Sequence, residues 1–224
     1  VSTLKVPDKE DIAQAMAKVD YTQLKYDDAT GILSTDNPDI QIELGAIGKG
    51  YAIEQTKDVL KRSDASGGMV SAGSSIYVCG TKKDGSRFRV ALRDPRGDEN
   101  SAIGVLTLSD TTISTSGDYE RYFEKDGVRY HHILDPRTGY PADSGLMQVT
   151  IICDDSVIGD ALSTACFVLG LDEGMKLAAK YGVNAIFVDT DKNIWYNTPD
   201  VLNYFEFTGK DSGYVLNEYN QARS

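Results

Sequence analysis

The fold of this chain is best predicted outward from Tyr130–Pro141, which reads YHHILDPRTGYP and holds both histidines of the sequence. Residues 128–134 alternate between apolar and polar types, as a strand does. The following Asp-Pro-Arg-Thr-Gly predicts a turn, because proline fixes φ and glycine permits a left-handed backbone. Polar groups at a strand end beside a rigid turn are typical of an active site, and a polar hairpin with incidental histidines is the alternative.

The two histidines are adjacent, at positions 131 and 132. Neighbouring side chains on a strand point to opposite faces, so we do not expect both to bind one ligand. One of the two is therefore expected to be structural.

Composition limits the classes of function. The chain has 224 residues, of which 41% are hydrophobic, and this length can bury a substantial core as one domain. A net charge of -11 argues against non-specific binding to nucleic acid or to an anionic membrane surface. An anionic ligand would need local cations, a metal ion or backbone amides. Cys79, Cys153 and Cys166 form no CxxC motif, which favours buried thiols over a disulfide framework.

The hydrophobic pattern predicts strands interrupted by helices without strict alternation. This favours an α+β fold with a mixed or antiparallel sheet and packed helices over a doubly wound fold. Helices are predicted over 8–18, 50–62, 157–169 and 172–181. Strands are predicted over 22–26, 31–34, 40–44, 69–71, 76–79, 87–92, 105–108 and 148–152, with a hairpin over 184–189 and 193–196. The polar tail from 208 to 224 is expected to pack poorly.

The segment Glu43–Tyr51 is predicted to lead from a strand into a helix through three glycines. Glycine permits close backbone approach and a helix N-terminus favours anions, so a phosphate could bind here. The segment is not a Walker A loop, because Gly50 stands where that motif has a magnesium-binding Ser or Thr. A tight turn with glycines for packing is the favoured interpretation of this segment alone.

Two further segments carry oxygen-rich side chains. Asp160 and Thr164 share one face of a predicted helix at i and i+4, and such hard ligands suit Mg²⁺ with substrate phosphates. Asp160 is equally compatible with the first turn of a helix, where the dipole favours acidic residues. Thr112–Tyr122 is hydroxyl-rich around Gly117, and it predicts either a loop that binds phosphate or sugar or a solvated turn.

Four segments in this order resemble the FAD:protein FMN transferases, the ApbE-type family. They are Glu43–Ala52 (ELGAIGKGYA), Ser114–Phe123 (STSGDYERYF), Tyr130–Pro141 and Gly159–Gly170 (GDALSTACFVLG). The resemblance covers most of the chain, and its joint order and spacing are highly specific. It implies a single ApbE-like catalytic domain over 1–224, with a T-fold-related α+β architecture.

The resemblance also implies a reaction. Members bind FAD as substrate with Mg²⁺, release AMP and attach FMN to a Thr or Ser in the flavinylation motif of an acceptor flavoprotein. The implied metal ligands are the side chains of Asp160 and Thr164 and the backbone carbonyl of Ala46. The implied flavin contacts are Glu43, Lys49, Ser116, Gly117 and the backbone at Leu134. Some relatives carry a second carboxylate where this chain has Ser163.

His132 is implied to lie near the transferred phosphoryl group, where an imidazole suits base catalysis at neutral pH. Asp135 either orients this histidine or takes the proton itself, and both roles stay open. Phosphoryl transfer depends mainly on positioning and charge neutralisation, and Mg²⁺ would bring a diphosphate to this acidic chain. FAD pyrophosphatase activity and a non-catalytic flavin-binding module are the alternatives.

The chain departs from the family pattern in two places. Residues 1–40 do not match the N-terminal Gly-Ala-Phe-Asp segment that helps to enclose FAD, so we expect a fragment or processed form with an open cleft. Gly73-Ser74-Ser75 stands where many members have Gly-Gly-Asn or Gly-Gly-Asp. Relatives are usually exported, so the full-length precursor is expected to be an extracytoplasmic, membrane-anchored lipoprotein without membrane insertion by this segment.

Overall fold

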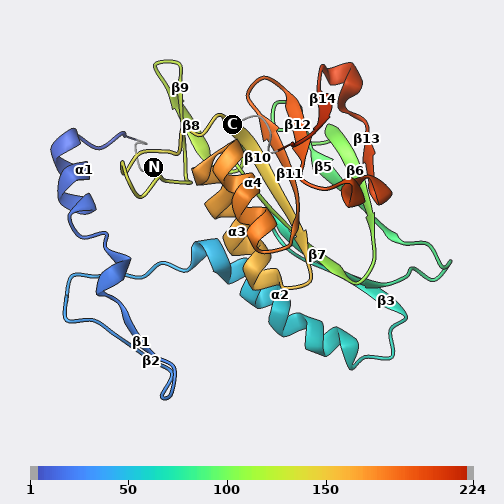
Figure 1. Ribbon diagram of the computed structural model, residues 1–224, viewed down its shortest axis with the longest axis horizontal. Helices are drawn as coiled ribbons and strands as arrows, with labels where there is room; N and C mark the ends of the chain where they lie inside the picture. Colours follow the sequence, from blue (N-terminus) through green and yellow to red (C-terminus); the bar gives the residue numbers. More distant parts are fainter. Residues whose placement is uncertain (1–4, 221–224) are drawn as a thin grey trace.

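A seven-stranded sheet runs through the centre of the molecule, with helices on one face and a three-stranded sheet on the other (Figure 1). The computed structural model describes residues 5–220. The strand order of the central sheet is β14-β12-β11-β10-β7-β4-β3, and all neighbours are antiparallel except β12 and β14. The predicted α+β fold with a mixed, mainly antiparallel sheet is confirmed.

The elements have the following bounds. The central sheet comprises β3 (Gly67–Ala72), β4 (Ser75–Gly80), β7 (Thr111–Gly117), β10 (Leu146–Cys153), β11 (Asn184–Asp189), β12 (Asn193–Tyr196) and β14 (Val215–Glu218). The three-stranded sheet comprises β5 (Phe88–Arg93), β6 (Ala102–Leu108) and β13 (Phe205–Phe207). Two hairpins are formed by β1 (Lys25–Asp27) with β2 (Ile32–Ser34), and by β8 (Tyr122–Lys125) with β9 (Val128–His131). The helices are α1 (Lys9–Met16), α2 (Gly45–Lys61), α3 (Ser156–Leu169), α4 (Leu171–Lys180) and the 3-10 turns η1 (Tyr21–Gln23), η2 (Pro199–Asn203) and η3 (Gly209–Ser212).

The core is divided into two halves by the central sheet. Strand β10 is buried at seven of its eight positions, as expected for a strand covered on both faces. Val149 and Ile151 pack with Phe167 of α3 on the helical side. Ile152 packs with residues of β5 and β6 on the other side. Helix α3 is thereby fixed against β7 and β10, and its position decides where Asp160 lies.

Helix α2 begins at Gly45, not at the predicted Gly50, and the strand predicted over 40–44 does not form. The Glu43 carboxylate accepts a hydrogen bond from the Gly45 amide over 2.8 Å, which satisfies one first-turn donor. The glycines therefore lie inside a helix rather than in a turn before it. Gly50 allows α2 to pack closely on α3, because a Cβ there would lie 2.2 Å from the Ser156 carbonyl oxygen.

The hydroxyl-rich segment expected as a loop or turn forms strand β7 up to Gly117. It lies between β4 and β10, and its threonines favour a strand because they are β-branched. Its hydroxyls find partners on neighbouring strands, as Thr115 Oγ1 does with Thr150 Oγ1 at 2.9 Å. The β-branched threonines of this segment are typical of a strand, but its many polar side chains favoured the prediction of a loop or turn.

The C-terminal segment differs from the expectation of a poorly packed tail. Tyr214 is 2% exposed and donates a hydrogen bond to Asp94 over 2.6 Å. Strand β14 pairs with β12 at the edge of the central sheet. The buried Tyr214 side chain and the pairing with β12 hold this segment in place, although its composition is polar. Residues 221–224 of the predicted tail lie outside the described residues.

The N-terminal arm, residues 5–44, extends away from the body (Figure 1). The predicted helix over 8–18 forms as α1, and the strand predicted over 22–26 is divided between η1 and β1. Ile12 and Met16 of α1 approach Gly139 of the Asp-Pro-Arg-Thr-Gly turn. Within residues 5–220, no helix is long and apolar enough to cross a membrane.

Candidate active site

The site is centred on Asp160, which is 1% exposed and lies where α3 packs on α2. Its Oδ2 accepts a hydrogen bond from the Gly50 amide over 2.8 Å. Its Oδ1 accepts one from Ser75 Oγ and lies 3.1 Å from the Lys49 ammonium. A buried carboxylate needs such partners, because desolvating an unpaired charge is costly. Residues from α2, β4 and α3 therefore converge on one anionic group.

Hydroxyl groups surround the next turn of α3. Ser116 Oγ of β7 lies 2.9 Å from Ser163 Oγ and 3.0 Å from Thr164 Oγ1. Ser163 Oγ also donates to the Asp160 carbonyl oxygen over 2.9 Å. Asp160 and Thr164 do share one helix face, and strand β7 adds Ser116 to it. The result is an oxygen-rich site with a single carboxylate.

Ala46 lies one turn before Gly50 on α2. In an α-helix its carbonyl points toward the amide of residue 50, and that amide contacts Asp160. Ala46 therefore lies on the face of α2 that bears Gly50, the residue whose amide contacts Asp160. The described residues hold no group of three or more His, Cys, Asp or Glu side chains that could hold a metal. The donors that remain are hard oxygens, which fit Mg²⁺ with water or phosphate as its further ligands.

The two histidines are separated as strand alternation predicts. His131 is 8% exposed, its Nε2 lies 3.2 Å from the Ala142 carbonyl oxygen, and its ring packs edge-on against Phe167. Burial lowers the pKa of His131 below its usual value. His132 is exposed to solvent. His131 is therefore the structural histidine, and His132 is the one that a substrate can reach.

Asp135 is bound to its own turn. Its carboxylate accepts hydrogen bonds from the Arg137 amide at 2.8 Å and from the guanidinium at 2.8 to 3.1 Å. These bonds hold the pKa of Asp135 below its usual value. Among residues 5–220 no hydrogen bond joins Asp135 to His132 or His132 to the Asp160 cluster. The geometry therefore assigns Asp135 to the shape of the turn and gives no support to its orienting His132.

The remaining predicted site residues are Glu43, Gly117 and Leu134. Glu43 precedes the first turn of α2, and Gly117 ends β7, where a Cβ would lie 2.4 Å from the Tyr119 ring. Leu134 is exposed and its backbone bridges to Pro141. Lys49, Ser116, Asp160 and Thr164 are brought together, whereas no described contact connects Leu134 to that cluster. Ser75, a partner of Asp160, is not among the predicted site residues, and its only signal in the sequence is the departure of Gly73-Ser74-Ser75 from the family pattern.

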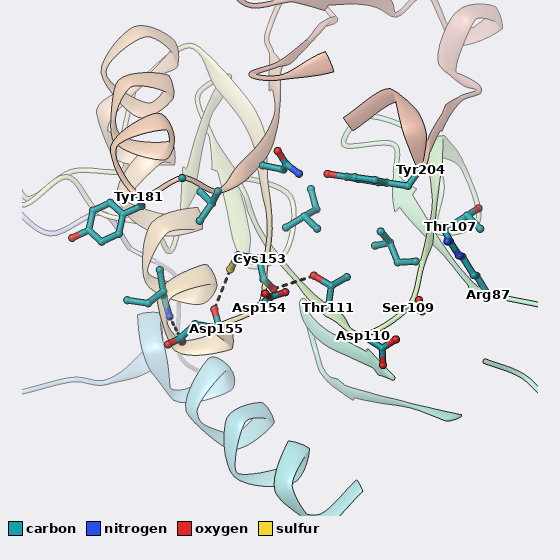
Figure 2. A pocket seen from close by; sticks show the side chains of 16 residues that line it. Arg87, Thr107, Ser109, Asp110, Thr111, Cys153, Asp154, Asp155, Tyr181 and Tyr204 are labelled. Carbon is teal, nitrogen blue, oxygen red and sulfur yellow. Dashed lines mark hydrogen bonds between the residues drawn. The ribbon is translucent and has the colours of Figure 1, made fainter. Parts of the chain in front are cut away.

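A cavity of about 690 Å³ lies elsewhere, where β10 ends and α3 begins (Figure 2). Tyr181 and Tyr204 stand on opposite sides of it, and Cys153 lies in its floor (Figure 2). Burial raises the pKa of the Cys153 thiol to about 11, so this sulfur stays protonated at neutral pH. None of the predicted site residues lines this cavity.

Fold and site together define an α+β protein with an oxygen-lined, cation-compatible centre between two helices and a hydroxyl-bearing strand. The chain belongs to the ApbE family, whose model matches residues 2–187.

Named relatives and solved structures cover most of this chain. It is 36% identical over 212 residues to the FAD:protein FMN transferase of Klebsiella pneumoniae (strain 342), covering 94% of this chain and 64% of the relative. It is 34% identical over 203 residues to that of Treponema pallidum, covering 84% and 56%. The crystal structure of the ApbE protein from Thermotoga maritima gives a TM-score of 0.74 at 35% identity, covering 93% of this chain and 64% of that one. The flavin transferase ApbE from Vibrio cholerae gives 0.74 at 27% identity, covering 96% and 65%. The chain thus spans less than two thirds of the length of these relatives.

Proposed function

We propose that this chain carries the catalytic residues of an FAD:protein FMN transferase. The reaction moves the FMN moiety of FAD to a Thr or Ser hydroxyl of an acceptor flavoprotein and releases AMP. The observation that carries this proposal is the convergence of Asp160, Thr164, Ser116 and Lys49 from three distant segments. The names of the relatives, which specify FAD and a protein acceptor, support the same reaction.

We propose Asp160, Thr164 and the Ala46 carbonyl as the residues that hold Mg²⁺. When bound, this ion would neutralise the diphosphate of FAD and the charge that develops on it. Oδ2 of Asp160 has one protein donor, the Gly50 amide, which leaves acceptor capacity for a cation. Ser163 supplies a hydroxyl where some relatives supply a carboxylate, so Asp160 carries the negative charge of the site alone.

Lys49 and the hydroxyls of β7 would bind the flavin nucleotide. The Lys49 side chain is 37% exposed, so its ammonium can leave Asp160 for a phosphate oxygen. Such a local cation matters because the chain carries a net charge of -11 and would otherwise repel an anionic substrate. Glu43, Ser116, Gly117 and the Leu134 backbone complete the proposed contacts with FAD.

His132 is the proposed general base. It is exposed beside a turn that Asp135 and Arg137 fix, so an acceptor hydroxyl can approach it. The imidazole would take the hydroxyl proton as the oxygen attacks the phosphorus of FMN, and AMP leaves with the electrons of the broken bond. The same exposure admits water, so FAD pyrophosphatase activity is the second candidate.

One assay separates these functions. The chain is incubated with FAD, MgCl₂ and a recombinant acceptor flavoprotein, and covalent flavin fluorescence and AMP are both measured. Labelled acceptor with equimolar AMP is expected. AMP without label would indicate hydrolysis, and FAD binding without either product would indicate a flavin-binding module. Equal labelling by Asp160→Asn and the native chain would contradict the metal assignment.

We also propose, from the family resemblance alone, that the full-length protein acts outside the cytoplasmic membrane as a lipoprotein. Cell fractionation with an antibody against this domain would test the location. Recovery of the protein in the cytosolic fraction alone would contradict it.

A further inference from the structure

Strand β9 has one edge that pairs with no other strand among residues 5–220. It pairs with β8 on one side through a two-residue turn in which Asp126 and Gly127 both have positive φ. Such a turn is flanked by a hydrogen-bonded pair, here Lys125 and Val128, and hydrogen-bonded pairs then alternate along the ladder. The His132 amide donates to the Arg121 carbonyl over 3.0 Å, which agrees with this alternation.

The alternation places the backbone groups of Arg129 and His131 on the outer edge of β9. Within residues 5–220, no hydrogen bond satisfies the N–H or C=O of either residue. The hairpin also projects from the body, away from the central sheet (Figure 1). A strand edge with unpaired backbone groups is a template for another strand.

A groove of about 450 Å³ follows this edge, within the range of ligand pockets. All residues of 127–131 line one wall and all residues of 140–146 line the other. Successive residues of a strand point to opposite faces, so a groove on one face would be lined by every second residue. Because every residue of 127–131 lines this groove, the groove runs along the edge of β9. We call this space the β9 groove.

Both walls of the β9 groove carry a buried polar atom without a partner. They are His131 Nδ1 and Ser144 Oγ, two of the four such side-chain atoms in residues 5–220. The Nε2 of His131 faces a carbonyl oxygen, which can only accept, so Nε2 carries the proton and Nδ1 is a bare acceptor. Buried polar groups are normally paired, so these two atoms leave hydrogen-bonding capacity unused in both walls.

The groove ends beside the proposed catalytic base. The Ala142 amide donates to the Ile133 carbonyl over 2.9 Å and Leu134 bridges to Pro141, which closes the space just beyond His131. The residue that directly follows β9 is His132. A chain lying in the groove would therefore end at the histidine that is proposed to accept the hydroxyl proton.

We propose that the β9 groove binds an extended segment of the acceptor protein, which adds as a strand to β9 and presents its Thr or Ser hydroxyl to His132. This inference rests on the proposed function, because it assumes a protein acceptor. Main-chain hydrogen bonds to Arg129 and His131 give the affinity, as in other complexes formed by strand addition.

The test uses a short fluorescein-labelled peptide centred on the acceptor threonine, with binding to the native chain measured by fluorescence anisotropy. A series of peptides carries one N-methyl group each, which removes a single backbone N–H. Methylation at every second residue is expected to raise the Kd about tenfold, and methylation between them is expected to change it less than about twofold, because only alternate N–H groups face β9. A flat series, or no binding of the unmethylated peptide, would overturn the proposal.

A protein variant gives a second measurement. Ser144→Trp fills the groove and is expected to weaken peptide binding at least tenfold, while Ser86→Trp on an exposed turn serves as the matched control. Circular dichroism shows whether both variants are folded. If Ser144→Trp does not fold, the methylated peptides alone test the groove. Labelling that persists unchanged in folded Ser144→Trp would overturn the groove and leave the transferase standing. Alternating peptide binding without flavin transfer would support the groove and overturn the transferase.

Discussion

The backbone amide of Gly50 donates a hydrogen bond to the carboxylate of Asp160 over 2.8 Å, across 110 positions of the chain. A Cβ at residue 50 would lie 2.7 Å from the Cβ of Asp160 and 2.2 Å from the Ser156 carbonyl oxygen. The glycine therefore sets how closely α2 approaches α3, and with it the position of Lys49 beside the buried carboxylate.

Replacing Gly50 by alanine is expected to destabilise the protein. The added methyl overpacks a helix contact, which costs about 1–3 kcal/mol of the free energy of unfolding. Gly48→Ala is the matched control, since nothing lies within 4 Å of a Cβ there, and it should stabilise the helix by about 0.5–1 kcal/mol. Urea denaturation measures both, and equal stabilities of the two variants would contradict the close contact.

Removing the charge of Asp160 should abolish stabilisation by Mg²⁺. A ligand that binds only the folded state raises the free energy of unfolding by about 2.7 kcal/mol at a hundredfold excess over its Kd. We expect MgCl₂ to raise the Tm of the native chain but not that of Asp160→Asn. The exposed Asp191→Asn serves as the control for general charge effects. A Mg²⁺-dependent rise that survives in Asp160→Asn would place the metal elsewhere.

His132→Asn is expected to slow flavin transfer with FAD still bound. Loss of a general base typically costs about 10²–10⁴-fold in rate, and an exposed side chain contributes little to the fold. Stopped assays of acceptor fluorescence give the rate, and equilibrium dialysis gives the FAD affinity. Unchanged rates would contradict the assignment of the base role to His132.

His131 should make stability depend on pH. Burial depresses the pKa of His131 in the folded state, so the unfolded chain binds a proton first as pH falls below about 6.5. The stabilisation is present above that pH and is lost as pH falls toward the folded-state pKa. Thermal unfolding between neutral and mildly acidic pH should show a smaller loss of Tm in His131→Gln. An identical loss in both proteins would assign the pH dependence to other groups.

Tyr214→Phe tests whether the C-terminal segment belongs to the core. The substitution removes a buried 2.6 Å hydrogen bond to Asp94, and an unsatisfied buried group costs about 1–3 kcal/mol. Tyr219→Phe removes a more exposed bond to Asp172 and should change stability by less than about 0.5 kcal/mol. Chemical denaturation distinguishes the two, and no effect of Tyr214→Phe would restore the view of a loosely packed tail.

The parts of the fold that the sequence predicted are those with strong local signals. Helix α3 and its end at Gly170 follow from apolar periodicity and a glycine cap, and α4 follows in the same way. The start of α2 was missed because three closely spaced glycines favour a turn locally, and the contact of Gly50 with α3 is encoded in no local pattern. Strand β14 was missed because ladder pairing, not hydrophobicity, holds it in the sheet.

The candidate site also has a part that local sequence patterns predict and a part that they do not. The spacing of Asp160 and Thr164 is visible in the sequence, since i and i+4 lie on one helix face. The roles of Ser75 and Gly50 are not visible, because they come from elements 85 and 110 positions away from Asp160. Proline and glycine predict the turn at Asp135, but the ion pair between the Asp135 carboxylate and Arg137 is visible only in the structure.

The ion pair between Lys49 and Asp160 has a consequence for how such a protein matures. Because the carboxylate already holds an internal counter-cation, the two helices can close around it in a medium poor in divalent ions. Under the proposed function, loading with Mg²⁺ would then be a separate event after folding, in which the metal ion exchanges with the lysine. The concentration of free Mg²⁺ where the protein works would thereby govern its activity without governing whether it folds.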